Sequence, residues 1–188
     1  MRSDLYTLPA GLPVPEDDGA CDHLMGRMLP QLTLESSQGA VSLRSLSLER
    51  LVLYVYPRTG RPDRPSPAGW DAVPGARGCT PQSCAFRDHA AELQELAAAV
   101  AGLSAQPREE QLEFAERNHI SYPVIADPEL KLGAALGLPT FEFDGEMLYR
   151  RVTLVLEACA VSKVFYPVFP PDENAAQVVA WLRSRDAS

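Results

Sequence analysis

Histidine is scarce in this chain, and long runs of apolar or of basic residues are absent from it. The three histidines, His23, His89 and His119, are dispersed and lack the spacing of metal ligands. No apolar segment approaches the length of a membrane-spanning helix, and residues 1–23 contain no apolar core of a signal peptide. We therefore expect no metal, no cofactor, no membrane partner and a cytoplasmic location.

The charge balance and the length narrow the class of protein further. The formal net charge is -8, and without a long stretch of Lys and Arg a nucleic-acid partner is disfavoured. Small molecules or other proteins are better candidates. With 188 residues, 46% of them hydrophobic, and no internal repeat, the chain should form one globular domain.

The apolar and polar patterns predict strands and helices in alternation. Residues 1–30, rich in Pro and Asp, read as an extended N-terminal arm, and residues 31–188 as the domain. We expect a hairpin turning near Gln38 and Gly39, a buried strand at 51–57, and a long Pro/Gly-rich loop at 58–78. The later elements are predicted as helices at 80–98, 107–118, 128–137 and 172–185, strands at 99–105 and 122–127, and two strands within 146–168 that turn near residues 158–160.

This order of elements predicts the fold class. Strand–helix–strand units followed by a hairpin and a final helix suit an α/β thioredoxin-like sandwich, with a central mixed sheet flanked by helices. The amino-terminal arm would be an extension of that sandwich. A fold of this kind is shared by proteins of many functions, so the function has to be argued from individual residues.

Two of the four cysteines, Cys79 and Cys84, are close in sequence and fall on one predicted helix. In a cytoplasmic protein, thiols are normally reduced, so catalytic or redox roles are more plausible than a structural framework. Five residues along an ideal helix separate two Cα atoms by roughly 8.7 Å. A disulfide tolerates no more than about 7 Å. The two sulfurs therefore cannot bond while the helix is intact.

Helical periodicity gives the two cysteines different surroundings. Cys79 begins an apolar stripe that continues through Phe86 and Leu93, whereas Cys84 belongs to a more polar face. Two unreactive thiols therefore remain an alternative, and this alternative fits Cys79 better than Cys84. Pro81 is tolerated only in the first turn of a helix, which places Cys79 at the helix N-terminus. There the backbone N–H groups stabilise a thiolate. Arg77, two residues earlier, is interpreted as a solvated loop charge.

Several segments of the sequence resemble those of a known family. The strand LVLYVYP, the motif GCTPQSCAFRD, the segment GLSAQPREEQLEFAERNHISYPVIADPELKLGAALGL and the strand RVTLVL are similar to those of Q-type peroxiredoxins, the bacterioferritin-comigratory-protein subfamily of thiol peroxidases. The resemblance covers roughly residues 30–185. It implies a thiol-specific peroxidase that reduces hydrogen peroxide and organic hydroperoxides, is recycled by thioredoxin or a similar dithiol, and is a monomer.

The resemblance also implies roles for individual residues. Cys79 would be the peroxidatic cysteine and Cys84 the resolving cysteine, which form an intramolecular disulfide. The arginine of the family motif R-x-[ST]-x-L falls on Arg151, where it would bind the peroxide and the thiolate. Arg150, the preceding residue, is the other candidate for this arginine. Because side chains alternate along a strand, only one of the two can face the site, and the match of Thr153 favours Arg151.

The chain departs from the family pattern before the peroxidatic cysteine. The family motif P-x-x-x-T-x-x-C is interrupted here by the Pro/Gly-rich segment, so we assign its proline and threonine to Pro57 and Thr59. Alternatively, Thr59 is an ordinary turn residue and its hydroxyl role is lost or taken by Thr80, which otherwise resembles a helix cap. We further expect the loop at 58–78, with its four arginines, to border the site as a lid.

Two other functions remain open at the level of sequence. A general thiol–disulfide oxidoreductase is one, although such enzymes usually rely on C-x-x-C rather than C-x₄-C. A non-catalytic thioredoxin-fold metal carrier, binding through Cys79, Cys84 and a histidine, is the other. Cys159 is interpreted as a packing residue, and Cys21 has no assigned role.

Overall fold

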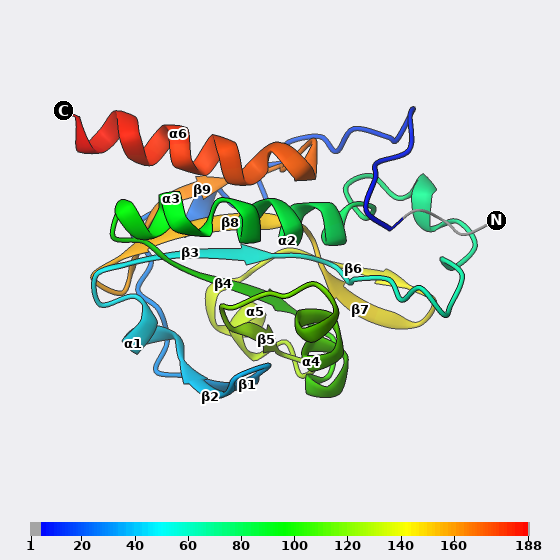
Figure 1. Ribbon diagram of the computed structural model, residues 1–188, viewed down its shortest axis with the longest axis horizontal. Helices are drawn as coiled ribbons and strands as arrows, with labels where there is room; N and C mark the ends of the chain where they lie inside the picture. The colour runs from blue at the N-terminus through cyan, green and yellow to red at the C-terminus, as the bar shows by residue number, and fades with distance from the viewer. Residues whose placement is uncertain (1–4, 188) are drawn as a thin grey trace.

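The computed structural model describes residues 5–187, and its centre is a seven-stranded mixed sheet (Figure 1). The strand order is β2-β1-β5-β4-β3-β8-β9. Strands β3, β4 and β5 are parallel, and the outer pairings are antiparallel. The strands are β1 (Thr33–Ser36), β2 (Gly39–Ser42), β3 (Arg50–Val55), β4 (Ala99–Ser104), β5 (Val124–Ala126), β8 (Val152–Glu157) and β9 (Ala160–Phe165).

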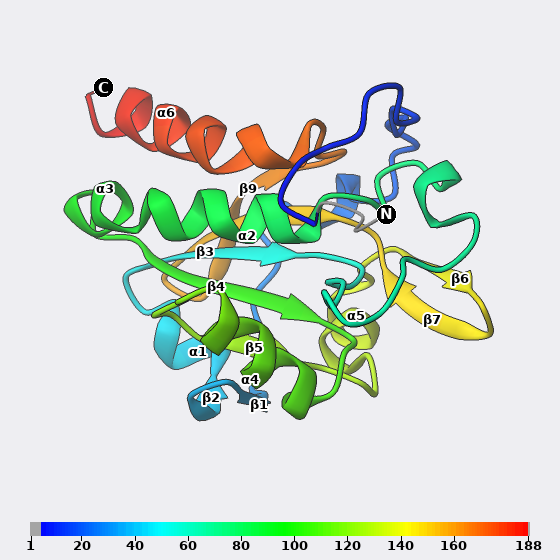
Figure 2. The same ribbon diagram turned by 45° about the vertical axis from the view of Figure 1, so that its right-hand side comes forward.

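Helices cover both faces of this sheet. The helices are α1 (Leu43–Leu46), α2 (Cys79–Asp88), α3 (Ala90–Glu95), α4 (Arg108–Arg117), α5 (Lys131–Leu136) and α6 (Asn174–Asp186). Alternate residues of β3 face opposite sides: Leu51 and Leu53 pack with α1 and α5, whereas Val52 and Tyr54 pack with α2, α3, α4 and α6. Helices α2 and α6 run side by side in both ribbon views (Figures 1 and 2). The thioredoxin-like sandwich predicted from the sequence is therefore confirmed.

The predicted helix at 80–98 is in fact two helices. Helix α2 begins one residue earlier than predicted, at Cys79, and α3 follows after a single turn residue, His89. At the break, the backbone N–H of His89 bonds to Ala85, and the N–H of Leu93 bonds to His89. The hydrogen bonds thus continue across the break, which is why the apolar periodicity of the sequence did not reveal it.

The predicted strand after residue 146 is also divided, and part of it belongs to a separate hairpin. Strands β6 (Thr140–Phe143) and β7 (Glu146–Tyr149) pair with each other outside the main sheet, and β8 begins only at Val152. This hairpin packs against the long loop at 58–78. Trp70 of the loop is 5% exposed and lies 5.0 Å from the ring of Phe143. Loop and hairpin therefore form a small apolar cluster of their own at one end of the sheet.

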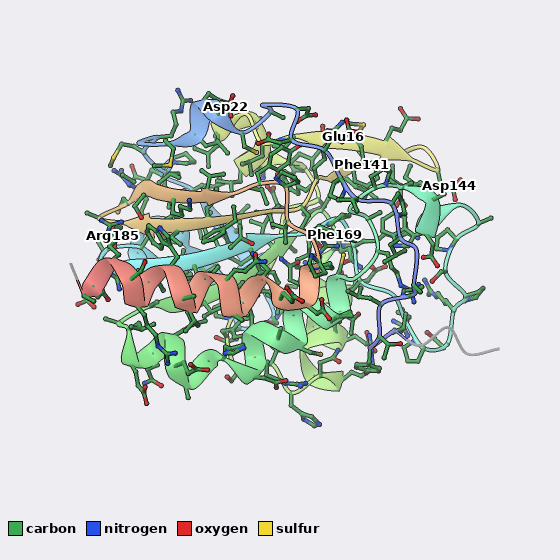
Figure 3. All side chains as sticks on the ribbon, turned by 90° about the horizontal axis from the view of Figure 1, so that it is seen from above. Glu16, Asp22, Phe141, Asp144, Phe169 and Arg185 are labelled. Carbon is green, nitrogen blue, oxygen red and sulfur yellow. The ribbon has the colours of Figure 1, made fainter. Side chains whose placement is uncertain are left out.

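The amino-terminal arm lies on the domain from residue 5 onward. It is largely irregular apart from one 3₁₀ turn, η1 (Asp22–Leu24), and Leu24 and Leu29 belong to the main core. Seen from above, Glu16 of the arm lies beside Phe141 of the hairpin (Figure 3). Among residues 5–187, no helix is long and apolar enough to cross a membrane.

Candidate active site

Cys79 is the first residue of α2, and a glycine sets the start of that helix. Gly78 has a φ of 105°, a left-handed conformation that other residues rarely adopt. A Cβ atom added to Gly78 would lie 2.4 Å from Pro171 and 2.7 Å from Leu8. Both the backbone conformation and the lack of space therefore exclude a larger residue. This turn places Cys79 beside the unpaired N–H groups at the N-terminal end of α2.

Arg151 contacts the sulfur of Cys79 directly. Its Nη2 lies 3.2 Å from Sγ of Cys79, and both side chains are buried, with 4% and 3% exposed. A cation at this distance stabilises negative charge on the sulfur. The other hydrogen bonds of the guanidinium go to the carbonyl oxygens of Gly75, Ala76 and Arg77 and to the side chain of Gln82. The arginine is thus fixed in orientation before any substrate arrives.

Arg150 points away from this centre. Its Nη1 forms an ion pair with Asp18 of the arm at 2.6 Å and lies 3.4 Å from the hydroxyl of Tyr166. The structure therefore brings Arg151, and not its neighbour, to Cys79, as the alternation argument predicted. Arg151 shares its face of the sheet with Thr153, which α2 and α6 cover.

A buried polar network supports Arg151, and sequence reasoning did not identify it as a network. Gln82 accepts a hydrogen bond from Arg151 and donates one to Asn174 at the start of α6, over 3.1 Å. Thr153 donates to the same oxygen of Asn174 over 2.7 Å. All three network residues are fully buried. Signals were present for two of the three: Thr153 matches the family motif, and Gln82 lies one helical turn after Cys79 on the buried side of α2.

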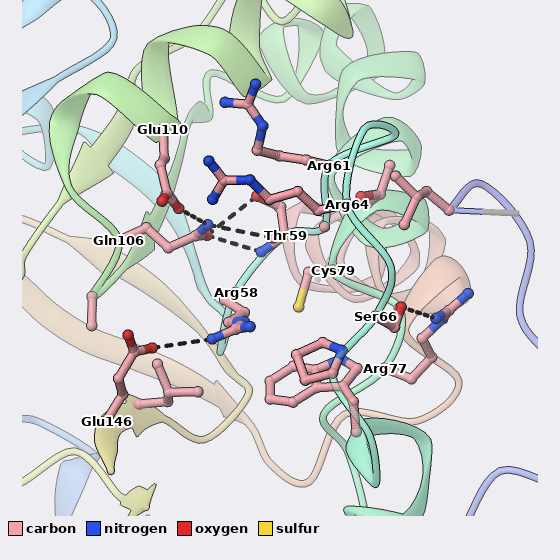
Figure 4. A pocket seen from close by; sticks show the side chains of 18 of the residues that line it. Arg58, Thr59, Arg61, Arg64, Ser66, Arg77, Cys79, Gln106, Glu110 and Glu146 are labelled. Atoms are coloured by element: carbon pink, nitrogen blue, oxygen red, sulfur yellow. Dashed lines mark hydrogen bonds and ion pairs between the residues drawn. The ribbon is translucent and has the colours of Figure 1, made fainter. Parts of the chain in front are cut away.

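Cys79 lies at a pocket of about 530 Å³ that the long loop borders (Figure 4). One wall is made by loop residues that include Thr59, Arg61, Arg64 and Trp70. The rest of the lining comes from the segments around Gln106 and Leu130, from strand β7, and from Leu5 of the arm. The expectation that the loop borders the site is thus confirmed.

Thr59 lines the same pocket as Cys79 and is held there by Gln106. The Oε1 atom of Gln106 accepts hydrogen bonds from the backbone N–H of Thr59 at 2.9 Å and from its hydroxyl at 3.2 Å. The amide of Gln106 in turn donates to Glu110 at 2.8 Å. Thr59 is 7% exposed, so its hydroxyl has a fixed orientation at the pocket wall. Sequence reasoning found Thr59 but missed Gln106.

Pro57 and Thr80, the other two residues considered for the family motif, differ in where they lie. Pro57 is buried and lines a second cavity, of about 400 Å³, which is bordered by the arm, by Gly75 and by Arg151. Pro57 does not line the pocket of Cys79. Thr80 is the second residue of α2 and does not cap it, because the cap position belongs to Gly78. Thr80 does line the first pocket.

The interpretation of Arg77 as a solvated charge is wrong. Arg77 is only 9% exposed, and its Nη1 lies 3.1 Å from the hydroxyl of Ser66 and 3.3 Å from the carboxylate of Asp71. These contacts tie the end of the loop to its middle. Partners that are 6 and 11 residues away in a loop leave no periodic signal in the sequence.

Cys84 lies on the same intact helix as Cys79, and both are free thiols. Its sulfur is half-buried and lies 3.8 Å from the side-chain oxygen of Asn118, which follows α4. Burial raises the pKa of Cys84 above its ordinary value, and Arg87 opposes this shift in part. Cys84 does not line the pocket of Cys79, so the two thiols are separated in space as well as unbonded.

Comparison with known proteins defines the class. The redoxin family profile matches residues 24–179. Peroxiredoxin Q of Gentiana triflora chloroplasts is 26% identical over 186 residues, covering 96% of this chain and 78% of that protein. Peroxiredoxin Q of Suaeda salsa chloroplasts is 29% identical over 161 residues, covering 85% and 67% respectively. The crystal structure of peroxidoxin BcpB from Mycobacterium tuberculosis superimposes with a TM-score of 0.68 at 27% identity, covering 85% of this chain and 96% of that one.

The chain therefore belongs to the redoxin family of thioredoxin-like proteins. Within that family it is a Q-type peroxiredoxin, a thiol peroxidase that acts on peroxide substrates. Of the three functions open at the level of sequence, the comparisons support the peroxidase.

Proposed function

We propose that Cys79 is the peroxidatic cysteine of this thiol peroxidase and that Cys84 resolves the oxidised form. The observation that carries this proposal is the 3.2 Å contact between Arg151 and the sulfur of Cys79, made at the edge of a pocket large enough for a substrate. Cys79 also lies at the N-terminus of α2. Two sources of positive potential therefore converge on one sulfur.

In the first step, the sulfur of Cys79 attacks the terminal oxygen of the hydroperoxide. The S–O bond forms as the O–O bond breaks, and the leaving alkoxide or hydroxide takes a proton to give an alcohol or water. Negative charge grows on the leaving oxygen, so fixed donors act most strongly in the transition state. Arg151 and the backbone N–H groups of α2 would supply them, with the hydroxyl of Thr59 placed at the pocket wall.

In the second step, Cys84 attacks the sulfenic acid on Cys79. A disulfide forms and the S–O bond breaks, and the hydroxyl leaves as water. The roughly 8.7 Å between two Cα atoms five residues apart on a helix must first fall below about 7 Å. The first turns of α2 therefore have to unwind before this bond can close.

The remaining parts of the cycle follow from the family assignment. We propose hydrogen peroxide and organic hydroperoxides as substrates, and thioredoxin or a similar dithiol protein as the reductant of the Cys79–Cys84 disulfide. The same assignment favours a monomer. A cytoplasmic location stays a proposal that rests on composition alone.

One assay tests the proposal. Reduced thioredoxin and its reductase are mixed with hydrogen peroxide and the protein, and the oxidation of NADPH is followed. We expect NADPH and peroxide to be consumed one for one with the unchanged protein. A general thiol–disulfide oxidoreductase or a metal carrier would not consume peroxide in this ratio, and that outcome would refute the proposal.

The two cysteines are then separated by substitution. Cys79→Ser should abolish turnover, whereas Cys84→Ser should reduce about one equivalent of peroxide per chain and stop as the sulfenic acid. Sustained thioredoxin-dependent turnover by Cys79→Ser would show that another thiol is the nucleophile.

A further inference from the structure

We propose that the pocket beside Cys79 selects hydroperoxides that carry a carboxylate, and that Arg64 binds this carboxylate. The inference rests on the proposed function, since it assumes that substrate enters the pocket where Cys79 lies. It concerns a specificity residue in the long loop, and it names the chemical class of the preferred substrate.

The first argument is the size and lining of the pocket. A volume of about 530 Å³ is far more than hydrogen peroxide needs, given that a water molecule occupies roughly 30 Å³ in the liquid. It falls in the ordinary range for organic ligands. Apolar side chains cover part of the wall, among them Leu5, Trp70, Leu130, Met147 and Leu148. The pocket therefore suits a hydroperoxide with an organic chain.

The second argument is the charge of the lining. Four arginines line the pocket against two carboxylates, those of Glu110 and Glu146, although the chain as a whole has a formal net charge of -8. The four arginines are Arg58, Arg61, Arg64 and Arg77. Asp63 and Asp71, which pair with Arg61 and Arg77, do not line the pocket, so the charged side chains that do line it are mostly positive and attract anions locally.

Three of these arginines are already paired with acids. Arg58 forms an ion pair with Glu146 at 3.0 Å and stacks over the ring of Trp70 at 5.3 Å. Arg61 pairs with Asp63 at 2.9 Å. Arg77 is bonded to Asp71 within the loop, as described above. These three arginines are therefore held in the pocket wall by their acidic partners and are not free to bind a ligand.

Arg64 differs from the other three. Within the part of the chain that the structure describes, no ion pair is found for its guanidinium, and the residue is exposed. In the close-up, its side chain extends beside Arg61 and toward the region of Thr59 and Gln106 (Figure 4). An unpaired guanidinium next to a second one favours a bound anion, and its two parallel N–H donors match a carboxylate.

The two ends of the substrate are thereby assigned. Cys79 is buried at one side of the pocket and Arg64 is exposed at another, so the hydroperoxide group would enter first and the carboxylate would stay near the solvent. The competing interpretation is that Arg64 is an ordinary solvated charge, which would contribute nothing to selectivity.

A matched pair of substrates tests this inference. The probes are 9-hydroperoxynonanoic acid and its methyl ester, which share a chain and differ in charge. The second-order rate constant for oxidation of the reduced protein is measured for each by stopped-flow tryptophan fluorescence, so no reductant is needed. At low ionic strength we expect the acid to react about fivefold faster than the ester, the upper range for an exposed ion pair. At high salt this ratio should approach one.

The variant Arg64→Gln should lower the ratio of acid to ester to about one. Arg27→Gln is the matched control, because Arg27 is an exposed arginine of the arm that does not line the pocket. A ratio near one in the unchanged protein at low salt, or an equal fall in Arg27→Gln, would overturn this inference alone. Failure of the unchanged protein to react with either probe or with hydrogen peroxide would overturn the proposed function as well.

Discussion

At the scale of the residue, the proposed activation of the peroxide depends on the contact between Arg151 and Cys79. The guanidinium makes hydrogen bonds to the carbonyl oxygens of residues 75–77 and to Gln82, so its position beside the sulfur is set by the fold. A donor that needs no reorganisation contributes most to a charged transition state.

Replacement of this arginine should therefore be costly. We expect Arg151→Met to slow the reaction of the reduced protein with hydrogen peroxide by about 10²–10³, the usual loss for one such donor. Arg150→Met is the matched control, because that side chain contacts Asp18 and Tyr166 instead. Stopped-flow measurement of both variants checks the prediction, and equal losses would contradict it.

A second residue-scale prediction concerns Gln106, which positions Thr59. Gln106→Met removes the acceptor for both the backbone N–H and the hydroxyl of Thr59. We expect a slower reaction with peroxide, about tenfold, for a lost pair of buried hydrogen bonds worth ~1 kcal/mol or more. Thr59→Val should cost a similar amount, and the double variant should cost less than the sum because both changes disable one interaction. Fully additive losses would show that Gln106 does not act through Thr59.

At the scale of the element, the proposed cycle requires α2 to adopt two arrangements. In the first, Gly78 packs against Leu8 and Pro171, and Gln82 is bonded to Arg151, which pins the helix start. In the second, the same turns must open so that Cys84 reaches Cys79. Pro81 favours opening because it contributes no N–H donor, and the end of a helix can open at little cost compared with global unfolding.

Oxidation should therefore loosen this helix reversibly. We expect faster amide hydrogen exchange across residues 80–87, and a smaller far-UV helical signal, after one equivalent of peroxide. Reduction should restore both, and Cys84→Ser should show neither change. Unchanged exchange in a chain that mass spectrometry shows to carry the Cys79–Cys84 bond would refute unwinding.

The long loop is held by one aromatic residue, which gives a prediction for the element as a whole. Trp70 is buried between the loop and the β6–β7 hairpin, so Trp70→Ala should weaken the loop's attachment by about 3 kcal/mol. We expect faster cleavage within residues 60–76 by proteinase K and slower reaction with organic hydroperoxides. Trp181→Ala on α6 is the control, and an equal rise in loop cleavage in that variant would contradict the prediction.

Elements with strong periodicity were predictable from the sequence, and those held by distant contacts were not. The buried strand β3 is a continuous apolar run, and the helices α4 and α6 repeat apolar residues at the helical period. The β6–β7 hairpin was not predicted because its apolar partner, Trp70, lies in a Pro/Gly-rich loop whose residues show no periodic pattern. In the site, Cys79, Arg151 and Thr59 were found through motifs. Gln106 and Asn174 were missed because buried hydrogen bonds between distant segments leave no local pattern.

At the scale of the whole molecule, the amino-terminal arm joins parts that are far apart in sequence. Asp18 binds Arg150 at 2.6 Å and accepts a hydrogen bond from Tyr166 at 2.8 Å, while Leu5 lines the active-site pocket. The hydrogen bond from Tyr166 lowers the pKa of Asp18. Because the pKa of Asp18 is lower in the folded protein than its ordinary value, the ionised carboxylate stabilises the fold at any pH above that ordinary value. This stabilisation is lost as the pH falls through the lowered pKa.

Release of the arm should therefore follow from loss of this carboxylate. We expect Asp18→Asn to increase amide exchange in residues 10–20 at neutral pH while the exchange of β3 and β4 stays slow. The unchanged protein should show the same local increase only below about pH 4, where Asp begins to be protonated. A uniform rise over the sheet would mean that Asp18 supports the domain rather than the arm.

Burial of the thiols has a practical consequence for anyone who labels this protein. Cys21, Cys79 and Cys159 are buried and only Cys84 is partly accessible, so a bulky alkylating reagent should modify one site in the native state and four after denaturation. Burial is the main cause that raises the pKa of Cys21 to about 12, and nearby carboxylates add to it. This thiol should therefore stay unmodified even in alkaline buffer. Peroxide is small enough to reach a sulfur that the reagent cannot. Thiol counts taken on the native protein would therefore detect the Cys79–Cys84 disulfide only through the loss of Cys84, and counts on denatured samples are needed to follow Cys79 itself.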